Sequence, residues 1–317
     1  MDISIVVPLY NEEESLLPLY EWIERVMKEN KFTFEVVFIS DGSTDSSWKI
    51  IETLKEQHPE QVKGIKFRNN YGKSPALYCG FQAAKGDVVI TMDADLQDSP
   101  DEIPALYSMI VNDGYDLVSG WKKKRYDSKL TKNLPSKLYN ATARKVTGLK
   151  LHDMNCGLKA YRNEVVKSIE VYGETHRYIP YLAKNAGFTR IGEKVVEHRK
   201  RQFGETKFGI DRFVNGYLDL ITLWFLAKFG KKPMHFFGLW GSLMFLLGLV
   251  AVCAVGFSKL IALYTGVHAP LVTSNPYFYL ALTAMLLGTQ LFLAGFVAEL
   301  ISRNSSERNN YSIEKEI

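Results

Sequence analysis

The chain of 317 residues has only three cysteines and no glycine-rich phosphate loop of the Gly-x-Gly-x-x-Gly or Walker type. Cys79, Cys156 and Cys253 are not spaced like metal ligands, which argues against a zinc site and against a disulfide framework. This cysteine usage fits a reducing compartment. Because no glycine-rich loop is present, a bound phosphate must be neutralised by a metal cation or by basic side chains.

Charge is missing from two segments of 22 residues each, 236–257 and 277–298. The mean hydropathy of the whole chain, −0.10, hides both of them. A transmembrane helix needs about 20 apolar residues, so each segment can cross a bilayer; a buried core helix is the alternative. The sequence therefore predicts two transmembrane helices, at about 236–262 and 277–299.

Lys and Arg are also missing from the connection between these segments, 265–276, whereas they flank the pair on both outer sides. Lys and Arg are enriched in cytoplasmic loops, so both termini are predicted to be cytoplasmic. No signal-peptide pattern precedes the first apolar run. We expect a multi-pass protein of the bacterial inner membrane with its N-terminal domain in the cytoplasm.

The N-terminal part alternates short apolar runs with helical patterns. The runs are 3–8, 34–40, 62–67 and 87–92, and the helical patterns between them cover about 13–28, 46–58 and 74–84. Such short apolar runs are typical of buried strands in a parallel sheet. The alternation predicts an α/β fold of the doubly wound type, which binds ligands beyond the carboxyl ends of its strands.

Polar clusters follow three of these predicted strands, at 8–12, 41–45 and 93–97. In the third cluster, Asp93 and Asp95 lie so close together that their charges repel and resist desolvation. A divalent cation shared with a phosphate-bearing ligand relieves this repulsion. The cluster therefore indicates a nucleoside-diphosphate site, and a solvated acidic turn is the alternative for an isolated Asp-x-Asp.

The three clusters read V-P-x-Y-N-E, D-G-S-x-D and D-A-D-x-Q, and this set resembles the family-2 inverting glycosyltransferases over roughly residues 1–210. The resemblance implies the GT-A fold, a Rossmann-like, mostly parallel sheet with flanking helices. It implies that Asp93 and Asp95 act in catalysis and that Asp95 and Gln97 bind Mg²⁺ or Mn²⁺. The residues that it places around the nucleotide-sugar donor are Pro8, Tyr10, Glu12, Asp41 and Asp93.

Two further segments resemble the polyprenyl-phosphate branch of this family, which includes dolichol-phosphate mannose synthase and bactoprenol glucosyltransferase. The segment 201–208 is similar to R-x-x-G-x-S-K-[WYF], with Thr206 in place of Ser, and makes Arg201 and Lys207 candidate phosphate ligands. The segment 153–161 is similar to D-x-x-[SC]-G-[FL]-[RK], which makes Asp153 a candidate catalytic residue or the first residue of a structural turn. The Q-x-x-R-W motif of processive polymer synthases is absent.

A basic segment from Lys122 to Lys150 contains ten Lys or Arg residues and a single acid, Asp127. Attraction to anionic lipid and phosphate, a solvated basic face and nucleic-acid binding are the three interpretations. Each basic residue near an anionic leaflet contributes about 1 kcal/mol, and the predicted membrane helices favour the lipid interpretation. Nucleic-acid binding is not expected, and Lys137 joins the candidate ligands of an acceptor phosphate.

Together these features predict an enzyme that transfers a sugar from a nucleotide sugar, by default UDP-glucose, to membrane polyprenyl phosphate with inversion. Transfer to a glycolipid hydroxyl and an inactive, membrane-tethered nucleotide-sugar binder are the alternatives. A lipid or solute translocator is disfavoured because two spans offer no buried charged pair. A homo-oligomer is left open. The expected domains are a glycosyltransferase domain (1–210), amphipathic juxtamembrane helices (211–235), the hairpin (236–299) and a polar tail (300–317).

Overall fold

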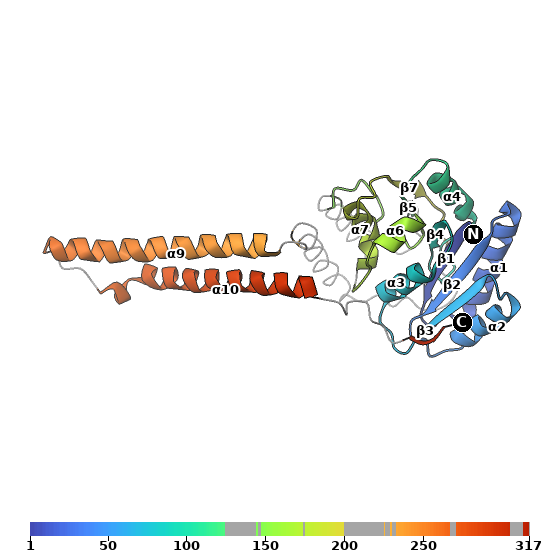
Figure 1. The fold of residues 1–317 in the computed structure, drawn as a ribbon, viewed down its shortest axis with the longest axis horizontal. Helices are drawn as coiled ribbons and strands as arrows, with labels where there is room; N and C mark the ends of the chain where they lie inside the picture. The colour runs from blue at the N-terminus through green and yellow to red at the C-terminus, as the bar shows by residue number, and fades with distance from the viewer. Residues whose placement is uncertain are drawn as a thin grey trace. The chain divides into compact units, whose positions relative to one another are not determined.

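The computed structural model describes residues 1–123, 144, 147–173, 175–199, 225, 229, 233–266, 271–304 and 313–316. The chain divides into two compact units. One unit comprises Met1–Leu220 together with Arg308–Ile317 and contains an eight-stranded sheet with its helices. The other, Ile221–Glu307, contains two long apolar helices (Figure 1). The juxtamembrane helices predicted at 211–235 lie largely outside the described residues.

The first unit begins with the predicted alternation of strands and helices. Its strands β1 to β4 and the helices between them differ from the predicted bounds by at most two residues. The elements up to β4 are β1 (Ile3–Leu9), α1 (Glu13–Asn30), β2 (Phe34–Ser40), α2 (Ser47–Gln57), β3 (Val62–Phe67), α3 (Lys73–Ala83) and β4 (Val88–Thr91).

After β4 the helices become shorter. A 3₁₀ turn, η1 (Pro100–Glu102), leads into α4 (Ile103–Val111) and then β5 (Leu117–Trp121). The remaining elements of this part are β6 (Lys159–Arg162), α6 (Asn163–Ser168), η2 (Thr175–Tyr178), α7 (Ile179–Asn185) and β7 (Ile191–Val195).

The strands lie in the order β7-β5-β6-β4-β1-β2-β3-β8, where β8 is Ile313–Glu316. The strands β4, β1, β2 and β3 are parallel neighbours, whereas β6 runs antiparallel to both β4 and β5. The sheet is thus mixed and mostly parallel, as the sequence predicts. All seven residues of β2 are buried, because helices cover both faces of this central strand (Figure 1).

Two hydrophobic cores hold the helices on the sheet. On one face, helix residues such as Leu16 of α1, Ile51 of α2 and Leu106 of α4 pack against alternate residues of the strands. On the other face, α3, α6 and α7 contribute residues such as Phe81 and Val165. This layering leaves the two ends of the parallel strands as the places where polar side chains can gather.

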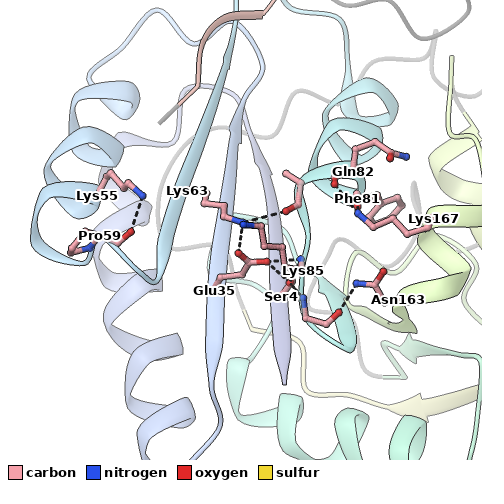
Figure 2. A network of polar contacts seen from close by, with 12 residues as sticks. Ser4, Glu35, Lys55, Pro59, Lys63, Phe81, Gln82, Lys85, Asn163 and Lys167 are labelled. Atoms are coloured by element: carbon pink, nitrogen blue, oxygen red, sulfur yellow. Dashed lines mark hydrogen bonds and ion pairs between the residues drawn. The ribbon is translucent and has the colours of Figure 1, made fainter. Parts of the chain in front are cut away.

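The amino ends of the strands are fastened by a buried carboxylate, Glu35 of β2 (Figure 2). Lys63 of β3 approaches Glu35 Oε2 to 2.6 Å, and Ser4 of β1 donates its hydroxyl to Oε1 at 2.6 Å. The backbone N–H of Lys85 also donates to Oε1, at 2.7 Å. Burial alone would raise the pKa of Glu35, but these donors hold it below its usual value. The network therefore ties β1, β2, β3 and the end of α3 together at the edge opposite the polar clusters.

The strand β8 comes from the far end of the chain and pairs antiparallel with β3, with Ile65 opposite Glu316 and Phe67 opposite Ile313. Lys315 forms an ion pair with Glu52 of α2. The polar tail expected over 300–317 therefore includes an edge strand. The segment Ile-Glu-Lys-Glu at 313–316 is short and lacks the alternation of apolar and polar residues that would indicate a strand.

The second unit contains α9 (Pro233–Tyr264), η3 (Val272–Ser274) and α10 (Pro276–Asn304). The two helices pack closely where glycines face each other: a Cβ on Gly241 would lie 2.6 Å from the Gly288 carbonyl oxygen. Both helices are long and apolar enough to cross a membrane: 18-residue stretches of Pro233–Tyr264 and of Pro276–Ala298 have mean hydropathies of 2.3 and 1.9. The helix α9 begins three residues before its predicted span and ends two residues after it. The helix α10 begins one residue before its predicted span and ends five residues after it.

Candidate active site

Three polar loops meet at the carboxyl edge of the sheet. The parallel register pairs Leu9 of β1 with Ser40 of β2 and Val6 of β1 with Thr91 of β4. The residues that follow these strands, at 10–12, at 41–45 and at 93–97, therefore start from neighbouring positions. The structure thus brings together the three clusters in which the sequence placed its donor and metal residues.

The loop after β1 is bonded to the loop after β2. Asn11, with φ +56°, donates its backbone N–H to Ser43 Oγ at 3.1 Å and accepts from the Thr44 N–H at 2.9 Å. The backbone N–H of Glu12 donates to Ser47 Oγ at 3.0 Å. Pro8 and Glu12 are half-buried and Tyr10 is 37% exposed, so the Tyr10 ring is accessible at this edge.

Asp41 lies directly after β2 and is buried. Its carboxylate accepts the backbone N–H groups of Tyr71 at 2.7 Å and Gly72 at 2.8 Å. Burial raises the pKa of Asp41, and the two N–H groups oppose that rise. The next residue, Gly42, has φ +70°, and a Cβ there would lie 2.6 Å from backbone atoms of Asn69 and Asn70. Asp41 and Gly42 thus hold the loop after β3 against the end of β2.

Asp93 follows β4 and forms an ion pair with Lys73, the first residue of α3. Burial would raise the pKa of Asp93, but Lys73 and Lys122 together keep it well below its usual value. A Cβ on Gly157 would lie 2.7 Å from Asp93 Cγ, so a larger residue there would have to displace this carboxylate. Asp93 is therefore an ionised group fixed between α3 and the segment before β6.

Asp95 and Gln97 lie on either side of Leu96, which is buried with φ +59° and anchors the loop in the core. Both flanking residues are half-buried. The Gln97 N–H donates to Asp95 Oδ1 at 3.2 Å, and the Gln97 carbonyl accepts the N–H of Arg199 at 3.0 Å. The loop is thus rigid while its polar side chains remain at the surface of the sheet edge.

The donor atoms of Asp95 and Gln97 are oxygens, which suit Mg²⁺ or Mn²⁺. Within the described residues, no group of three or more His, Cys, Asp and Glu side chains is placed to hold a metal ion. Two protein oxygens with phosphate oxygens and water are an ordinary ligand set for Mg²⁺. The residues at this edge therefore fit a metal that is bound together with a phosphorylated ligand.

Asp153 is buried and forms the contacts of a turn. Its Oδ1 accepts the N–H of Asn155 at 3.2 Å, and its own N–H donates to Glu193 at 3.2 Å. Its backbone carbonyl accepts the Ser119 hydroxyl at 3.3 Å. These contacts correspond to the turn interpretation of Asp153. The candidate phosphate ligands Lys137, Arg201 and Lys207 lie outside the described residues.

One member of the basic segment is not a surface residue. Lys122 has a 10% exposed side chain and lies 2.6 Å from Asp98, whose side chain is fully buried. Burial would lower the pKa of Lys122, but Asp98, Cys156 and Asp93 raise it above its usual value. Grouping Lys122 with lipid-facing residues was therefore wrong, because a count of charges along the chain does not reveal a buried partner 24 residues away.

Sequence reasoning also missed a cavity of about 120 Å³ beside Asp93. Lys73, Lys159, His176 and Arg177 line it together with Asp93. The Ser74 hydroxyl lies 3.0 Å from His176 Nδ1, which ties η2 to α3. Burial lowers the pKa of Lys159 and, together with the cations nearby, that of His176. Lys159 is the basic residue of the D-x-x-[SC]-G-[FL]-[RK] segment, and this was the one signal that the sequence offered.

Comparison with known proteins identifies relatives over nearly the whole chain. The chain is 32% identical to dodecaprenyl-phosphate galacturonate synthase of Rhizobium johnstonii, over 96% of this chain and 88% of that protein. It is 34% identical to undecaprenyl-phosphate 4-deoxy-4-formamido-L-arabinose transferase of Proteus mirabilis, over 99% of this chain and 93% of that protein.

Among solved structures, glucosyl-3-phosphoglycerate synthase of Mycobacterium tuberculosis with bound UDP has the same fold. The TM-score is 0.52 at 21% identity, over 71% of this chain and 79% of that one. The same enzyme has also been solved with Mn²⁺, UDP-glucose and phosphoglyceric acid. The glycosyl transferase family 2 model matches residues 4–170, more than half of the sequence. The chain is therefore a glycosyltransferase and belongs to glycosyl transferase family 2.

Proposed function

We propose that this enzyme transfers a sugar from a nucleoside-diphosphate sugar to the phosphate of a membrane polyprenyl phosphate, with inversion. The observation that carries this proposal is the similarity to two prenyl-phosphate sugar transferases over nearly the whole chain, including the segment with the apolar helices. The two relatives are named for different sugars, a uronic acid and a formamido-pentose. Neither name supports UDP-glucose, the default donor expected from the sequence.

The residues at the carboxyl edge of the sheet would hold the donor. Tyr10 would stack against the base, because its ring is exposed there, and Pro8, Glu12 and Asp41 would surround the base and ribose. Asp95 and Gln97 would hold Mg²⁺ or Mn²⁺ against the diphosphate. The bound cation would neutralise the charge that develops on the leaving nucleoside diphosphate.

The acceptor phosphate would be the nucleophile. A phosphate monoester has a second pKa of about 6, so it is largely dianionic at pH 7 and needs no strong general base. One of its oxygens attacks the anomeric carbon while the bond from that carbon to the diphosphate breaks. Catalysis then depends on positioning and on stabilisation of charge. Asp93 would orient the donor, and Asp153 would support the neighbouring turn.

Basic residues would hold the lipid phosphate. Arg201, Lys207 and Lys137 are proposed for this role, and the hairpin would keep the domain at the membrane surface. In the proposed topology both termini face the cytoplasm, because the segment 265–276 lacks Lys and Arg. The nucleotide sugars of the cytoplasm would then reach the sheet edge directly.

The test is to incubate membranes containing the enzyme with labelled nucleotide sugars and a short polyprenyl phosphate, and then to extract the lipid. The expected result is one labelled polyprenyl-phosphate sugar that depends on a divalent cation. Membranes with Asp95→Asn, which lacks a proposed metal ligand, should give little labelled lipid. Membranes with Asp101→Asn, a substitution of an exposed acid beyond the loop, serve as the matched control. Equal labelling of a polyprenol without phosphate would contradict the proposal and favour a hydroxyl acceptor.

A further inference from the structure

The loop that carries the proposed metal ligands is fastened on both sides of them. Asp93, at its start, forms an ion pair with Lys73. Asp98, at its end, is fully buried, whereas Asp95 and Gln97 between them are half-buried. The position of the two proposed ligands therefore depends on what holds Asp98.

A cation from the sheet holds Asp98. Lys122 directly follows β5, and its ammonium lies 2.6 Å from Asp98 Oδ1. The strand β5 is fixed between β6 and β7. An ionised carboxylate in the interior is costly unless a cation or hydrogen bonds compensate it, and Lys122 supplies a cation. The ion pair thus joins the loop after β4 to the end of β5, with β6 between these two strands in the sheet.

The backbone at this end of the loop is held as well. Asp98 forms an antiparallel bridge with His198, and the Gln97 carbonyl accepts the N–H of Arg199 at 3.0 Å. The Arg199 guanidinium lies 4.3 Å from the centre of the Trp22 ring on α1. Asp98 is therefore fixed by its side chain to the sheet and by its backbone to the segment 198–199.

A displacement of Asp98 would act directly on the proposed ligands. Gln97 is its neighbour in the chain, and the Gln97 N–H donates to Asp95 Oδ1 at 3.2 Å. Mg²⁺ takes its ligands at about 2.0–2.1 Å in near-octahedral geometry. A shift of the loop by more than about 0.2 Å would therefore weaken metal binding.

We propose that the buried ion pair between Lys122 and Asp98 positions the metal ligands Asp95 and Gln97, so that metal-dependent donor binding requires it. The inference rests on the proposed function and adds two positioning residues that act through the loop. Lys122 thereby has a role that differs from the attraction to lipid expected for the basic segment.

The ion pair could instead stabilise the fold alone, and the variants must separate these two roles. Removal of one partner leaves a buried charge, whereas replacement of both partners costs far less stability. The double variant Asp98→Asn with Lys122→Met carries neither charge and should unfold near the wild-type temperature. The matched control is Glu35→Gln with Lys63→Met, which neutralises a buried ion pair at the opposite edge of the sheet.

The experiment measures nucleotide binding to the purified full-length protein in detergent by calorimetry, with Mn²⁺ and with EDTA, in the absence of a lipid acceptor. UDP and GDP are both tested, and the one that the wild type binds more tightly is used. We expect Mn²⁺ to raise this affinity at least about tenfold in the wild type, because groups that orient metal ligands typically change metal affinity by about 10–100-fold and the wild type retains them. The double variant should lose most of this gain and keep its affinity in EDTA, and the control should keep both.

A folded double variant with the full Mn²⁺ gain would overturn the inference. An equal loss of affinity in Mn²⁺ and in EDTA would also overturn it, because the ion pair would then support the fold of the nucleotide site rather than the metal ligands. Asp98→Asn alone, which keeps the shape of the side chain, decides the matter if the double variant does not fold: loss of the Mn²⁺ gain supports the inference, and the full gain overturns it.

These outcomes are separate from those of the proposed function. A wild type without any Mn²⁺ gain would overturn the inference together with the proposed metal site. A full Mn²⁺ gain in the double variant, with transfer to polyprenyl phosphate by the wild type, would contradict the inference only. A lost gain in the double variant, with no transfer to polyprenyl phosphate by the wild type, would contradict the proposed acceptor only.

Discussion

At the scale of single residues, the acidic loop after β4 gives different surroundings to two carboxylates that are two positions apart in the sequence. Asp93 is fixed by Lys73 and by close contact with Gly157, whereas Asp95 is half-buried beside the anchored Leu96. The first carboxylate thus has an internal cation, and the second faces the edge of the sheet where a metal would bind. Their chemical roles are expected to differ accordingly.

Asp95→Asn should lower sugar transfer on the order of a hundredfold or more, because the amide has nearly the same volume but lacks the ligand charge. Transfer is measured at saturating donor with Mg²⁺ and with Mn²⁺, and thermal unfolding should be unchanged. Asp101→Asn is the control and should retain activity. Wild-type transfer rates in the Asp95→Asn variant, or in the presence of excess EDTA, would refute the metal site.

Gly157→Ala should destabilise the domain by about 1–3 kcal/mol, because the added methyl collides with the Asp93 carboxylate. The displaced Asp93 should also raise the donor KM. Gly256→Ala in α9 is the matched control, since a Cβ there meets nothing within 4 Å. Unchanged unfolding and unchanged donor KM in Gly157→Ala would show that the contact with Asp93 is not tight.

At the scale of elements, the sequence predicted the strands and helices from β1 to β4 well, because the strands are short, buried apolar runs that alternate with helical patterns. It could not predict pairings between distant segments. Lys73 forms an ion pair with Asp93, Lys122 forms one with Asp98, and β8 pairs with β3. No pattern in the neighbouring sequence indicates any of these contacts. The candidate site was predicted as three loops, but the cavity lined by Lys159 and Arg177 depends on where η2 packs.

The Glu35 network makes a prediction about stability and pH. Lys63→Met should cost about 3–5 kcal/mol at pH 7, because it leaves the fully buried Glu35 carboxylate without its cation. In the wild type the pKa of Glu35 is lowered from 4.5, so the ionised group stabilises the fold above pH 4.5 and this stabilisation is lost as the pH falls further. The difference in the free energy of unfolding between the wild type and Lys63→Met should therefore be smaller at acidic pH.

Thermal unfolding of the full-length protein at pH 7 and at pH 4 measures this difference. Lys55→Met is the control, because Lys55 donates to the Pro59 carbonyl at the surface, away from Glu35 (Figure 2). A deficit that is the same at both pH values would mean that Glu35 does not remain ionised in the variant at neutral pH.

At the scale of the whole molecule, the proposed topology can be tested with single cysteines. Ser274→Cys should react with a membrane-impermeant thiol reagent in intact cells, because it lies in the connection without Lys or Arg. Ser305→Cys should react only after permeabilisation. The native protein, with its three cysteines, gives the background. The reverse pattern would place the sheet domain away from cytoplasmic nucleotide sugars.

The pairing of β8 with β3 also has a consequence for biogenesis. Residues 313–316 leave the ribosome after both apolar helices, so the outer edge of β3 has no strand beside it while the hairpin is being translated. Until then its backbone N–H and C=O groups are open to pairing with other chains. Completion of the catalytic sheet is therefore a late step in synthesis, and a polypeptide that stalls within the hairpin carries an unfinished enzyme.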